Sequence, residues 1–447
     1  MEFTHIQQTP LWEAFSKLAR RISLPDGIFY WSGRAKKEAD INATIGSAYG
    51  TNSDLFGNGD QTWTILYVKY VTDLYKIPPQ EIAEYAPIGG LPELRQSWKN
   101  WIIYKCQNGA GIDVKPYLTS PLITAGVTDG LAIVGAMFLD AGDHIILPDK
   151  YWENYALIYG TIQQGEIQYF PFFLDGKFNL DGMVDRVRAS LEEKSKAVLL
   201  LNFPNNPTGF VPTIEDYRQI AERLSSVVDE LQKPLVLVSD DAYDGYTYDD
   251  NAACCSIFPY LVNQSPYLIP IKLDGVSKEM LMYGGRVGAF SIGIHPNWVD
   301  GSEKAALEAE INNKLEGYIR GTISNTSRSN QYVINDLLIN NMEQFLAQRD
   351  ASVNLLRRRY ELINKLLKDD PLPNATVDPN NGGFFLFVNV EGRKASDVAD
   401  QLLKQEKVGV IPFETPEIGV NGLRVAYCSV AEEDIPRLVD ALRACLS

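Results

Sequence analysis

The sequence predicts an α/β protein in which a mostly parallel sheet, covered by helices, is followed by a smaller α+β domain. The first observation is a series of apolar, β-rich runs in the middle of the chain, at His144–Leu147, Ala197–Phe203, Leu235–Ser239, Leu268–Leu273 and Arg286–Ile292. The second is that helix-like segments, such as Ile214–Leu231, separate several of these runs. Continuous apolar strands that alternate with helices are typical of a parallel sheet covered on both faces.

The third observation is a change of character after about residue 335. A charged, helix-rich stretch over Leu337–Asp369 leads to short strands at Gly383–Val390 and Leu423–Cys428, which indicates a second, α+β domain. A chain of 447 residues also exceeds what one hydrophobic core usually serves. We therefore expect an N-terminal segment (1–50), a large domain (51–330) and a small C-terminal domain (331–447). The N-terminal segment contains an amphipathic stretch, Trp12–Ile22, and we expect it to join the small domain.

Composition argues against several functional classes. The formal net charge is −16, and an acidic surface repels phosphate backbones, so we expect no nucleic-acid partner. No apolar run approaches the roughly 18 residues of a membrane helix, so we expect no membrane partner. The start of the sequence has no secretory signal and the five cysteines form no CxxC pair, so we expect a reduced, cytoplasmic protein. The three histidines lack metal-ligand spacing, so we expect no metal.

Polar side chains follow three of the predicted strands at the points where the strands end. In chain order these are Asn206, then Asp240 and Tyr243, then Lys278, with Arg286 eight residues further on. Taken singly, such residues are usually turn formers, helix caps or solvated surface charges. Ligands of open parallel sheets bind beyond the carboxyl ends of the strands, so we expect these side chains to lie together.

This set of residue types fits the chemistry of pyridoxal phosphate (PLP). The aldehyde of PLP needs a lysine amine for its Schiff base, and the pyridine nitrogen needs an acid that keeps it protonated. A phenol and an amide can hydrogen-bond the ring oxygen. An arginine and a helix start suit the phosphate.

The motifs resemble those of a known family. Asn206-Pro207-Thr208-Gly209, Asp240-x-Ala242-Tyr243, Ser277-Lys278 with Arg286, and Arg424 look like the signature of the aspartate aminotransferase family, among the class I/II, fold-type I PLP enzymes. Each motif is weak alone, but four in order between about residues 42 and 428 make a strong signal. The resemblance implies a large domain of the seven-stranded type with PLP as cofactor. It also implies an amino acid and a 2-oxo acid as substrates, of which 2-oxoglutarate is one, and a homodimer with shared active sites.

The resemblance also assigns roles at the cofactor. Lys278 would hold PLP and move the proton of the substrate Cα. Asp240 would pair with the pyridine nitrogen, while Tyr243 and Asn206 would bond the ring oxygen and lower the pKa of the Schiff base. Arg286 would bind the phosphate.

Further cofactor contacts come from three segments. Val127 and Thr128 open an apolar helical run after Thr124-Ala125-Gly126, where the resemblance places the phosphate loop. Trp152 would stack on the pyridine ring, and Tyr151 stays open as the alternative because a slip of one residue exchanges them. Tyr85 would reach the phosphate of the partner subunit's cofactor.

The substrate contacts are assigned in the same way. Arg424 would pair with the α-carboxylate, next to Asn206, because a planar guanidinium binds a carboxylate through two parallel hydrogen bonds. Gly46 and Phe385 would line the pocket, whereas Phe384 is expected in the core. Arg320, in a stretch Arg-x-x-x-Ser-Asn, would cross the subunit interface to a side-chain carboxylate, which indicates acidic substrates without excluding aromatic ones; the alternative is a helix-end arginine that caps carbonyls.

The match has departures, and other reactions stay open. Gly275 stands where many relatives carry a phosphate-binding serine, and Val127-Thr128-Asp129 and Asn52–Gly59 are also unusual. A decarboxylase, a C–S lyase or a cyclopropane-forming synthase would share the cofactor contacts. A PLP-binding transcription regulator is disfavoured, because only about fifty residues precede the large domain and the chain is acidic.

Overall fold

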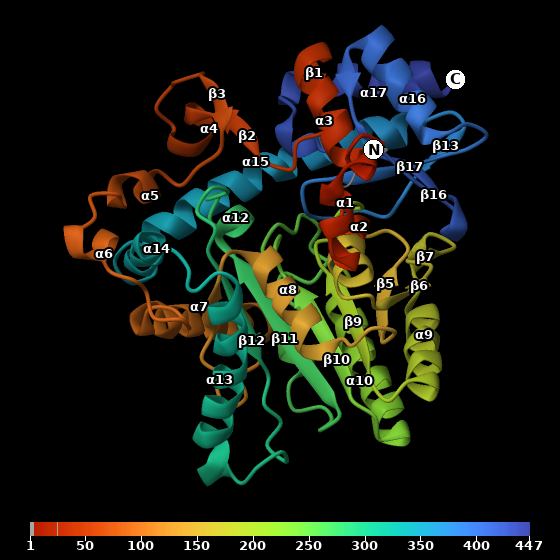
Figure 1. The fold of residues 1–447 in the computed structure, drawn as a ribbon. Coiled ribbons are helices and arrows are strands. Elements are labelled where there is room, and N and C mark those ends of the chain that lie inside the picture. The colour runs from red at the N-terminus through yellow and green to blue at the C-terminus, as the bar shows by residue number, and fades with distance from the viewer. Residues whose placement is uncertain (1–3, 25) are drawn as a thin grey trace.

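A seven-stranded sheet forms the centre of the protein in the computed structural model, which describes residues 4–24 and 26–447. Its strand order is β4-β12-β11-β10-β9-β5-β6. The strands are β4 (Leu122–Thr124), β5 (His144–Pro148), β6 (Glu166–Phe170), β9 (Ala197–Asn202), β10 (Leu235–Asp240), β11 (Leu268–Gly275) and β12 (Gly288–Ile292). Neighbours pair in parallel, except that β12 is antiparallel to both β11 and β4. The prediction of a mostly parallel sheet covered by helices is therefore confirmed (Figure 1).

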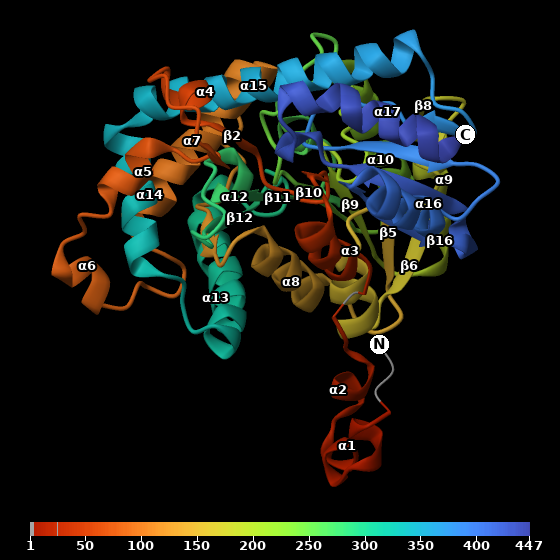
Figure 2. The same cartoon turned by 90° about the horizontal axis from the view of Figure 1, so that it is seen from above.

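Both faces of this sheet are buried under helices. Along β9, Leu199 and Leu201 face one hydrophobic cluster, whereas Val198 and Leu200 face another, because successive side chains of a strand point to opposite faces. The first face is covered by α9 (Leu180–Glu193), α10 (Ile214–Leu231) and α11 (Phe258–Leu261), and the second by α8 (Val127–Phe138) and α13 (Lys304–Thr322). Figure 2 shows α8 and α13 on the opposite side of the sheet from α9 and α10.

A second, antiparallel sheet lies near the C-terminus. Its order is β13-β14-β17-β16, with bounds Ala375–Val377, Leu386–Val390, Val420–Val425 and Ile411–Thr415. The helices α15 (Met342–Asp369), α16 (Ala395–Gln401) and α17 (Ile435–Leu446) pack around it. From the N-terminal segment, α3 (Asp26–Glu38) contacts β16, and β1 (Ile41–Asn42) pairs with β15 (Val408–Gly409).

The start of the chain differs from the expected stretch Trp12–Ile22. It forms two short helices, α1 (Pro10–Ala14) and α2 (Lys17–Arg21), because Phe15 is extended and the Ser16 side chain caps the second helix. Arg21 donates to the carbonyl of Thr161 at 2.7 Å, so this part contacts the segment between β5 and β6. Figure 2 shows α1 and α2 projecting from the body of the protein.

The remaining α-helices lie before the large sheet, within it or after it in the chain. They are α4 (Asn52–Phe56), α5 (Lys69–Leu74), α6 (Pro79–Ala83), α7 (Pro92–Ala110), α12 (Val276–Glu279) and α14 (Arg328–Asn340). The unusual segment Asn52–Gly59 contains α4, between β2 (Tyr49–Thr51) and β3 (Trp63–Ile65), and it packs on α15. The long helix α7 is anchored by buried Trp98 and Trp101 and packs against α14.

Candidate active site

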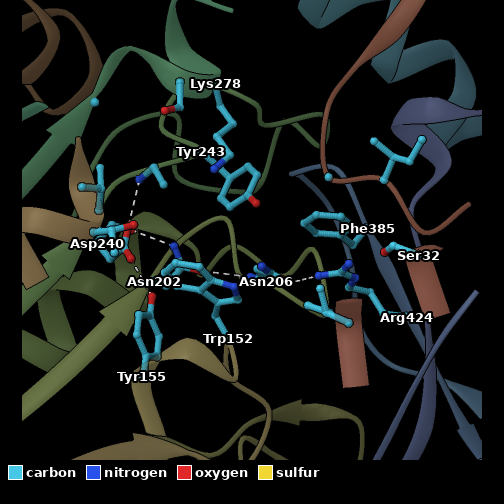
Figure 3. A pocket seen from close by; sticks show the side chains of 18 of the residues that line it. Ser32, Trp152, Tyr155, Asn202, Asn206, Asp240, Tyr243, Lys278, Phe385 and Arg424 are labelled. Atoms are coloured by element: carbon cyan, nitrogen blue, oxygen red, sulfur yellow. Dashed lines mark hydrogen bonds between the residues drawn. The ribbon is translucent and has the colours of Figure 1, made fainter. Parts of the chain in front are cut away.

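A cavity of about 390 Å³ lies at the carboxyl ends of the central strands, between the large sheet and the small sheet. Parallel strands present their carboxyl ends at one edge, which is where ligands of such sheets bind. The cavity brings together most of the residues that the sequence singled out. Among its lining residues are Gly46, Val127, Thr128, Trp152, Asn206, Asp240, Tyr243, Lys278, Arg286, Phe385 and Arg424 (Figure 3).

Asp240 ends β10 and forms the floor of the cavity. Its carboxylate accepts hydrogen bonds from the Tyr155 hydroxyl at 2.6 Å and from the amide of Ala242 at 3.1 Å. Burial raises the pKa of Asp240, although these two bonds and the positive charge of Lys278 oppose the rise. A buried carboxylate that faces an open cavity suits a positively charged ligand atom.

Lys278 stands in α12, a single helical turn that follows β11. Its Nζ lies 5.2 Å from the centre of the Tyr243 ring, with the cavity beyond (Figure 3). Burial lowers the pKa of Lys278, although the negative charge of Asp240 opposes this shift. The lysine therefore gives up its proton more readily than a surface lysine, as a nucleophilic amine must.

An anion cradle lies at the start of α8. The first amides of a helix have no partner within the helix, so Val127 and Thr128 can present theirs to a ligand. Gly126, at φ +88°, precedes them, and a β carbon there would lie 2.7 Å from Nη2 of Arg286. The Arg286 guanidinium thus lies directly beside the helix start, and it also donates to the Ser277 hydroxyl at 3.2 Å.

The structure explains two of the departures from the family pattern together. A β carbon on Gly275 would lie 2.8 Å from Cγ2 of Val127, closer than such contacts occur. The valine in the predicted phosphate loop therefore occupies the space that a serine at 275 would need. Ser277 lines the same cavity and bonds Arg286, so a hydroxyl is still present next to the cradle.

Arg424 closes the opposite end of the cavity. It is buried on β17, where it donates to Asn206 Oδ1 at 3.2 Å and to the Thr44 carbonyl at 3.1 Å. Its guanidinium lies 4.5 Å from the centre of the Phe385 ring. Its Nε is buried and has no hydrogen-bond partner within the described part of the chain. Burial lowers the pKa of Arg424, and an anionic ligand would supply the missing partner.

A chain of amide side chains joins the two ends of the cavity. The Asn202 side chain donates to the backbone carbonyl of Asp240 at 2.8 Å and accepts from the backbone amide of Asn206 at 2.9 Å. Asn206 in turn accepts from Arg424, so the end of β10 is linked to the small sheet (Figure 3). The distance between the acid and the arginine is therefore fixed by hydrogen bonds rather than by loops alone.

The surroundings of Trp152 and Tyr151 favour Trp152 as the residue that would stack on the pyridine ring. Trp152 lines the cavity, whereas Tyr151 stacks on Tyr169 and shares a hydroxyl contact with it at 3.1 Å. Phe384 is buried against Tyr246, 4.9 Å between ring centres, as expected of a core residue.

Two of the predicted residues lie away from the cavity. Tyr85 is 84% exposed, and Arg320 is an exposed residue that donates to the Ser324 hydroxyl at 2.6 Å. Neither side chain lines the cavity of its own chain. The roles expected for them involve a second subunit, so within one chain they remain predictions.

Sequence reasoning missed several lining residues. Tyr155 and Asn202 support Asp240, and Ile28, Phe29 and Ser32 come from α3. Tyr155 follows Trp152 by three residues, a spacing that could have suggested a second side chain on the same side. Nothing in the sequence of α3 marks it as part of the site.

The described part of the chain gives no support for a metal site or for a membrane-spanning helix. Within residues 4–24 and 26–447, the one group with metal-ligand atom spacing is His144, Glu166 and Glu193, but both glutamates are exposed and Lys194 lies within 3.6 Å of each. A lysine there supplies the positive charge, so we assign no metal. None of the described helices combines the length and apolar character needed to cross a membrane.

Comparisons with known proteins assign the chain to a family. Residues 76–442 match the family model for aminotransferase class I and II. A probable aspartate/prephenate aminotransferase of Aquifex aeolicus is 26% identical, over 80% of this chain and 82% of that protein. An aromatic-amino-acid aminotransferase of Thermococcus litoralis is 26% identical, over 79% and 81%. The crystal structure of an aminotransferase from Anaerococcus prevotii superposes with a TM-score of 0.80, at 26% identity, over 97% of this chain and 99% of that one. The chain is therefore an enzyme of the class I and II aminotransferases, a PLP-dependent family.

Proposed function

We propose that this enzyme moves an amino group between an acidic or aromatic L-amino acid and a 2-oxo acid, with 2-oxoglutarate as one partner, and that it does so with PLP in the cavity. The observation that carries the proposal is the arrangement of one cavity with a lysine and an acid at one end and a buried arginine at the other. The amino acid and the 2-oxo acid share an α-carboxylate next to the reacting carbon. One site can therefore bind the two substrates in turn.

The residues present fit PLP at each of its functional groups. The first amides of α8 and the guanidinium of Arg286 suit a phosphate. Asp240 suits the pyridine nitrogen, Tyr243 and Asn206 suit the ring oxygen, and Trp152 offers a flat face. When bound, PLP supplies an electron-withdrawing ring that stabilises negative charge at the substrate Cα.

The protein's own groups then divide the work. Arg424 holds the α-carboxylate of the substrate, which directs the Cα hydrogen towards Lys278. Nζ of Lys278 takes the proton from the substrate Cα as a base, and the ammonium group so formed then serves as the acid of the next step. Its lowered pKa leaves the amine free to accept that proton. Asp240 keeps its charge opposite the pyridine nitrogen, with Tyr155 and Asn202 holding it in place.

We further propose a homodimer with active sites completed by the partner subunit. The exposure of Tyr85 and Arg320 supports this proposal, because an exposed tyrosine and an arginine near the apolar surface residue Ile323 suit an interface. In a dimer, Tyr85 would contact the phosphate and Arg320 the side-chain carboxylate of an acidic substrate. We also propose a cytoplasmic location, which the five free cysteines support.

The test is a panel of amino acids incubated with 2-oxoglutarate and the PLP-loaded enzyme, followed by formation of the 2-oxo acid and glutamate. We expect acidic or aromatic amino acids to be the preferred donors, and Lys278→Ala to lower the rate by at least about 10⁴-fold. Release of carbon dioxide or sulfide in place of glutamate would instead indicate a decarboxylase or a C–S lyase.

The role of Arg320 has its own test. Arg320→Ala should lower kcat/KM for aspartate or glutamate by about tenfold or more while leaving aromatic donors within about twofold, because a charged hydrogen bond contributes about 1.5–3 kcal/mol. Equal losses for both classes of donor would show that Arg320 does not contact the substrate side chain.

A further inference from the structure

A second group of charged side chains lies behind the cavity, outside the proposed mechanism. We call it the ion cluster, and its members are Lys105, Asp241, Asp244, Lys272, Asp274 and Glu279. No member lines the cavity, and none has a side chain more than 9% exposed. Six buried ionisable groups at one place need a physical reason.

Two ammonium groups hold the cluster together. Nζ of Lys105, on α7, lies 2.7 Å from Glu279, 2.9 Å from Asp244 and 3.2 Å from Asp274. Nζ of Lys272, on β11, pairs with Asp241 and lies 3.0 Å from Asp274. The cluster thus joins three segments to α7: the loop after β10, the end of β11, and α12.

Each acid of the cluster is the neighbour in sequence of a residue that lines the cavity. Asp241 follows Asp240, Asp244 follows Tyr243, Asp274 precedes Gly275 and Glu279 follows Lys278. The same three segments therefore carry both cavity residues and members of the ion cluster. A shift of the cluster would move the cavity residues as well, because both are attached to the same backbone segments.

The helix α12 depends most on such contacts. It has only four residues, and a helix of one turn has little stability of its own. It is held by the Val276 amide on the Val287 carbonyl at 3.1 Å, by the Tyr246 hydroxyl on the Lys278 carbonyl at 3.0 Å, and by Glu279. Glu279 accepts from both Lys105 and the Trp101 indole, at 2.7 and 3.1 Å, and both donors stand on the long helix α7.

Stability alone is a weak reason for such a cluster. The desolvation of buried ions offsets most of their attraction, and apolar side chains of similar volume often serve a fold as well. Here four carboxyl groups face two lysines, with Arg349 contacting the Asp244 carbonyl at 3.4 Å. Directional ion pairs do fix geometry, which apolar packing does less strictly.

We propose that the Lys105–Glu279 ion pair is a positioning device that sets the place of Lys278 against Asp240 and Tyr243. The inference rests on the proposed function, in which Lys278 moves the proton of the substrate. A catalytic group misplaced by about 1 Å can cost about 100-fold in rate, so a rigid link from α12 to α7 has a clear use.

The test is Glu279→Gln in the PLP-loaded enzyme, because glutamine keeps the size and a hydrogen-bond acceptor but loses the charge. The pH midpoint of the visible absorption band of bound PLP should rise by about half a unit or more. Hydrogen bonds from Tyr243 and Asn206 to the ring oxygen would stabilise the deprotonated Schiff base, and a displaced Lys278 would weaken these bonds. The half-reaction rate at saturating amino acid should fall about tenfold, with KM changed less than about twofold. A simple loss of nearby negative charge would lower the midpoint instead.

A matched control and a second variant keep the test sharp. Lys233→Met removes a lysine bonded to the Leu191 and Lys194 carbonyls near the far end of β10, and it should lower the melting temperature but not move the midpoint. Trp101→Phe removes the other donor to Glu279 without changing charge, and it should raise the midpoint by a smaller amount. It also serves alone if Glu279→Gln does not fold.

The outcomes separate this inference from the proposed function. Wild-type enzyme that binds no PLP, or binds it without transaminating any amino acid, contradicts the proposed function. Active wild-type enzyme with an unchanged or lowered midpoint in the Glu279 and Trp101 variants overturns the positioning role. A raised midpoint in both variants, absent in Lys233→Met, supports it.

Discussion

The two ends of the cavity are built in different ways. The end that we propose for the cofactor, called the cofactor end, takes Asp240 from the end of β10, and Lys278 and Arg286 from the connection between β11 and β12. The end that we propose for the substrate, called the substrate end, takes Ile28 and Gly46 from the N-terminal segment, and Phe385 and Arg424 from the residue before β14 and from β17. One end is thus fixed by the buried sheet, whereas the other depends on how the small sheet and the N-terminal segment pack against it.

This difference separates the chemistry from the choice of substrate. The buried strands of the large sheet hold Asp240 and Lys278 to one geometry, so the cofactor end suits a reaction shared by a whole family. The substrate end includes Phe29, which is 56% exposed, on the helix α3, which packs on β15 and β16 and not within the large sheet. Changes at the cofactor end should alter the spectrum of bound PLP and the rate with every donor. Changes at the substrate end should alter KM and leave the spectrum intact.

The largest effect after loss of Lys278 is expected from Asp240→Asn. Without the negative charge the pyridine nitrogen loses its proton, so we expect kcat to fall about 10³-fold with every amino donor, measured in single-turnover experiments. Asp149→Asn is the matched control, because Asp149 follows β5 but accepts from the Phe172 amide at 3.0 Å instead of lining the cavity. Equal losses in the two variants would contradict the assignment.

Arg424→Ala tests the substrate end. Two charged hydrogen bonds to the α-carboxylate would be lost, so kcat/KM should fall about 100-fold, mostly through KM, while the enzyme keeps the visible band of bound PLP. Arg424→Lys keeps the charge but loses the planar fork, and it should recover only part of the loss. A changed spectrum with an unchanged KM would mean that Arg424 belongs to the cofactor end.

Gly275→Ser tests the contact with Val127 at the cofactor end. The added side chain would press on Cγ2 of Val127, so we expect PLP affinity to fall about tenfold, measured by titration of apoenzyme. Val127→Ala together with Gly275→Ser should restore the affinity, because it removes the clashing methyl groups. Failure of the double variant to recover would show that the two residues are not coupled.

Tyr155→Phe should give the smallest effect. It removes one hydrogen bond of 2.6 Å to Asp240, worth about 1 kcal/mol, so kcat should fall about fivefold for every donor. Tyr159→Phe is a close control, because the Tyr159 hydroxyl is buried without a hydrogen-bond partner in the described part of the chain. A larger loss in the control than in Tyr155→Phe would refute the supporting role of Tyr155.

Asp240 and Lys278 could be predicted from the sequence as candidates because each follows a recognisable strand. Asp240 and Lys278 stand where apolar runs stop, and the rule for open parallel sheets then brings them together. The substrate end was predicted only by resemblance for Arg424, Gly46 and Phe385, since no local pattern links residues so far apart. The α3 residues and Asn202 were missed because their contribution arises from packing that no spacing encodes.

Other features were outside the reach of sequence patterns. The Gly275–Val127 contact depends on β11 and α8 lying side by side, which no sequence pattern shows, although each residue departs from the family pattern. The ion cluster went unnoticed because its acids alternate with cavity residues and look like ordinary charged neighbours. The break at Phe15 and Ser16 also overrode the amphipathic pattern of Trp12–Ile22, because the capping serine starts a new helix.

The most direct test of the central claim is a half-reaction with a preferred amino donor and no 2-oxo acid. We expect the PLP-loaded enzyme to form a single equivalent of 2-oxo acid per active site, to lose its visible band, and then to stop until 2-oxoglutarate is added. Continuous product formation without any 2-oxo acid, or an unchanged band with every amino acid tried, would contradict it.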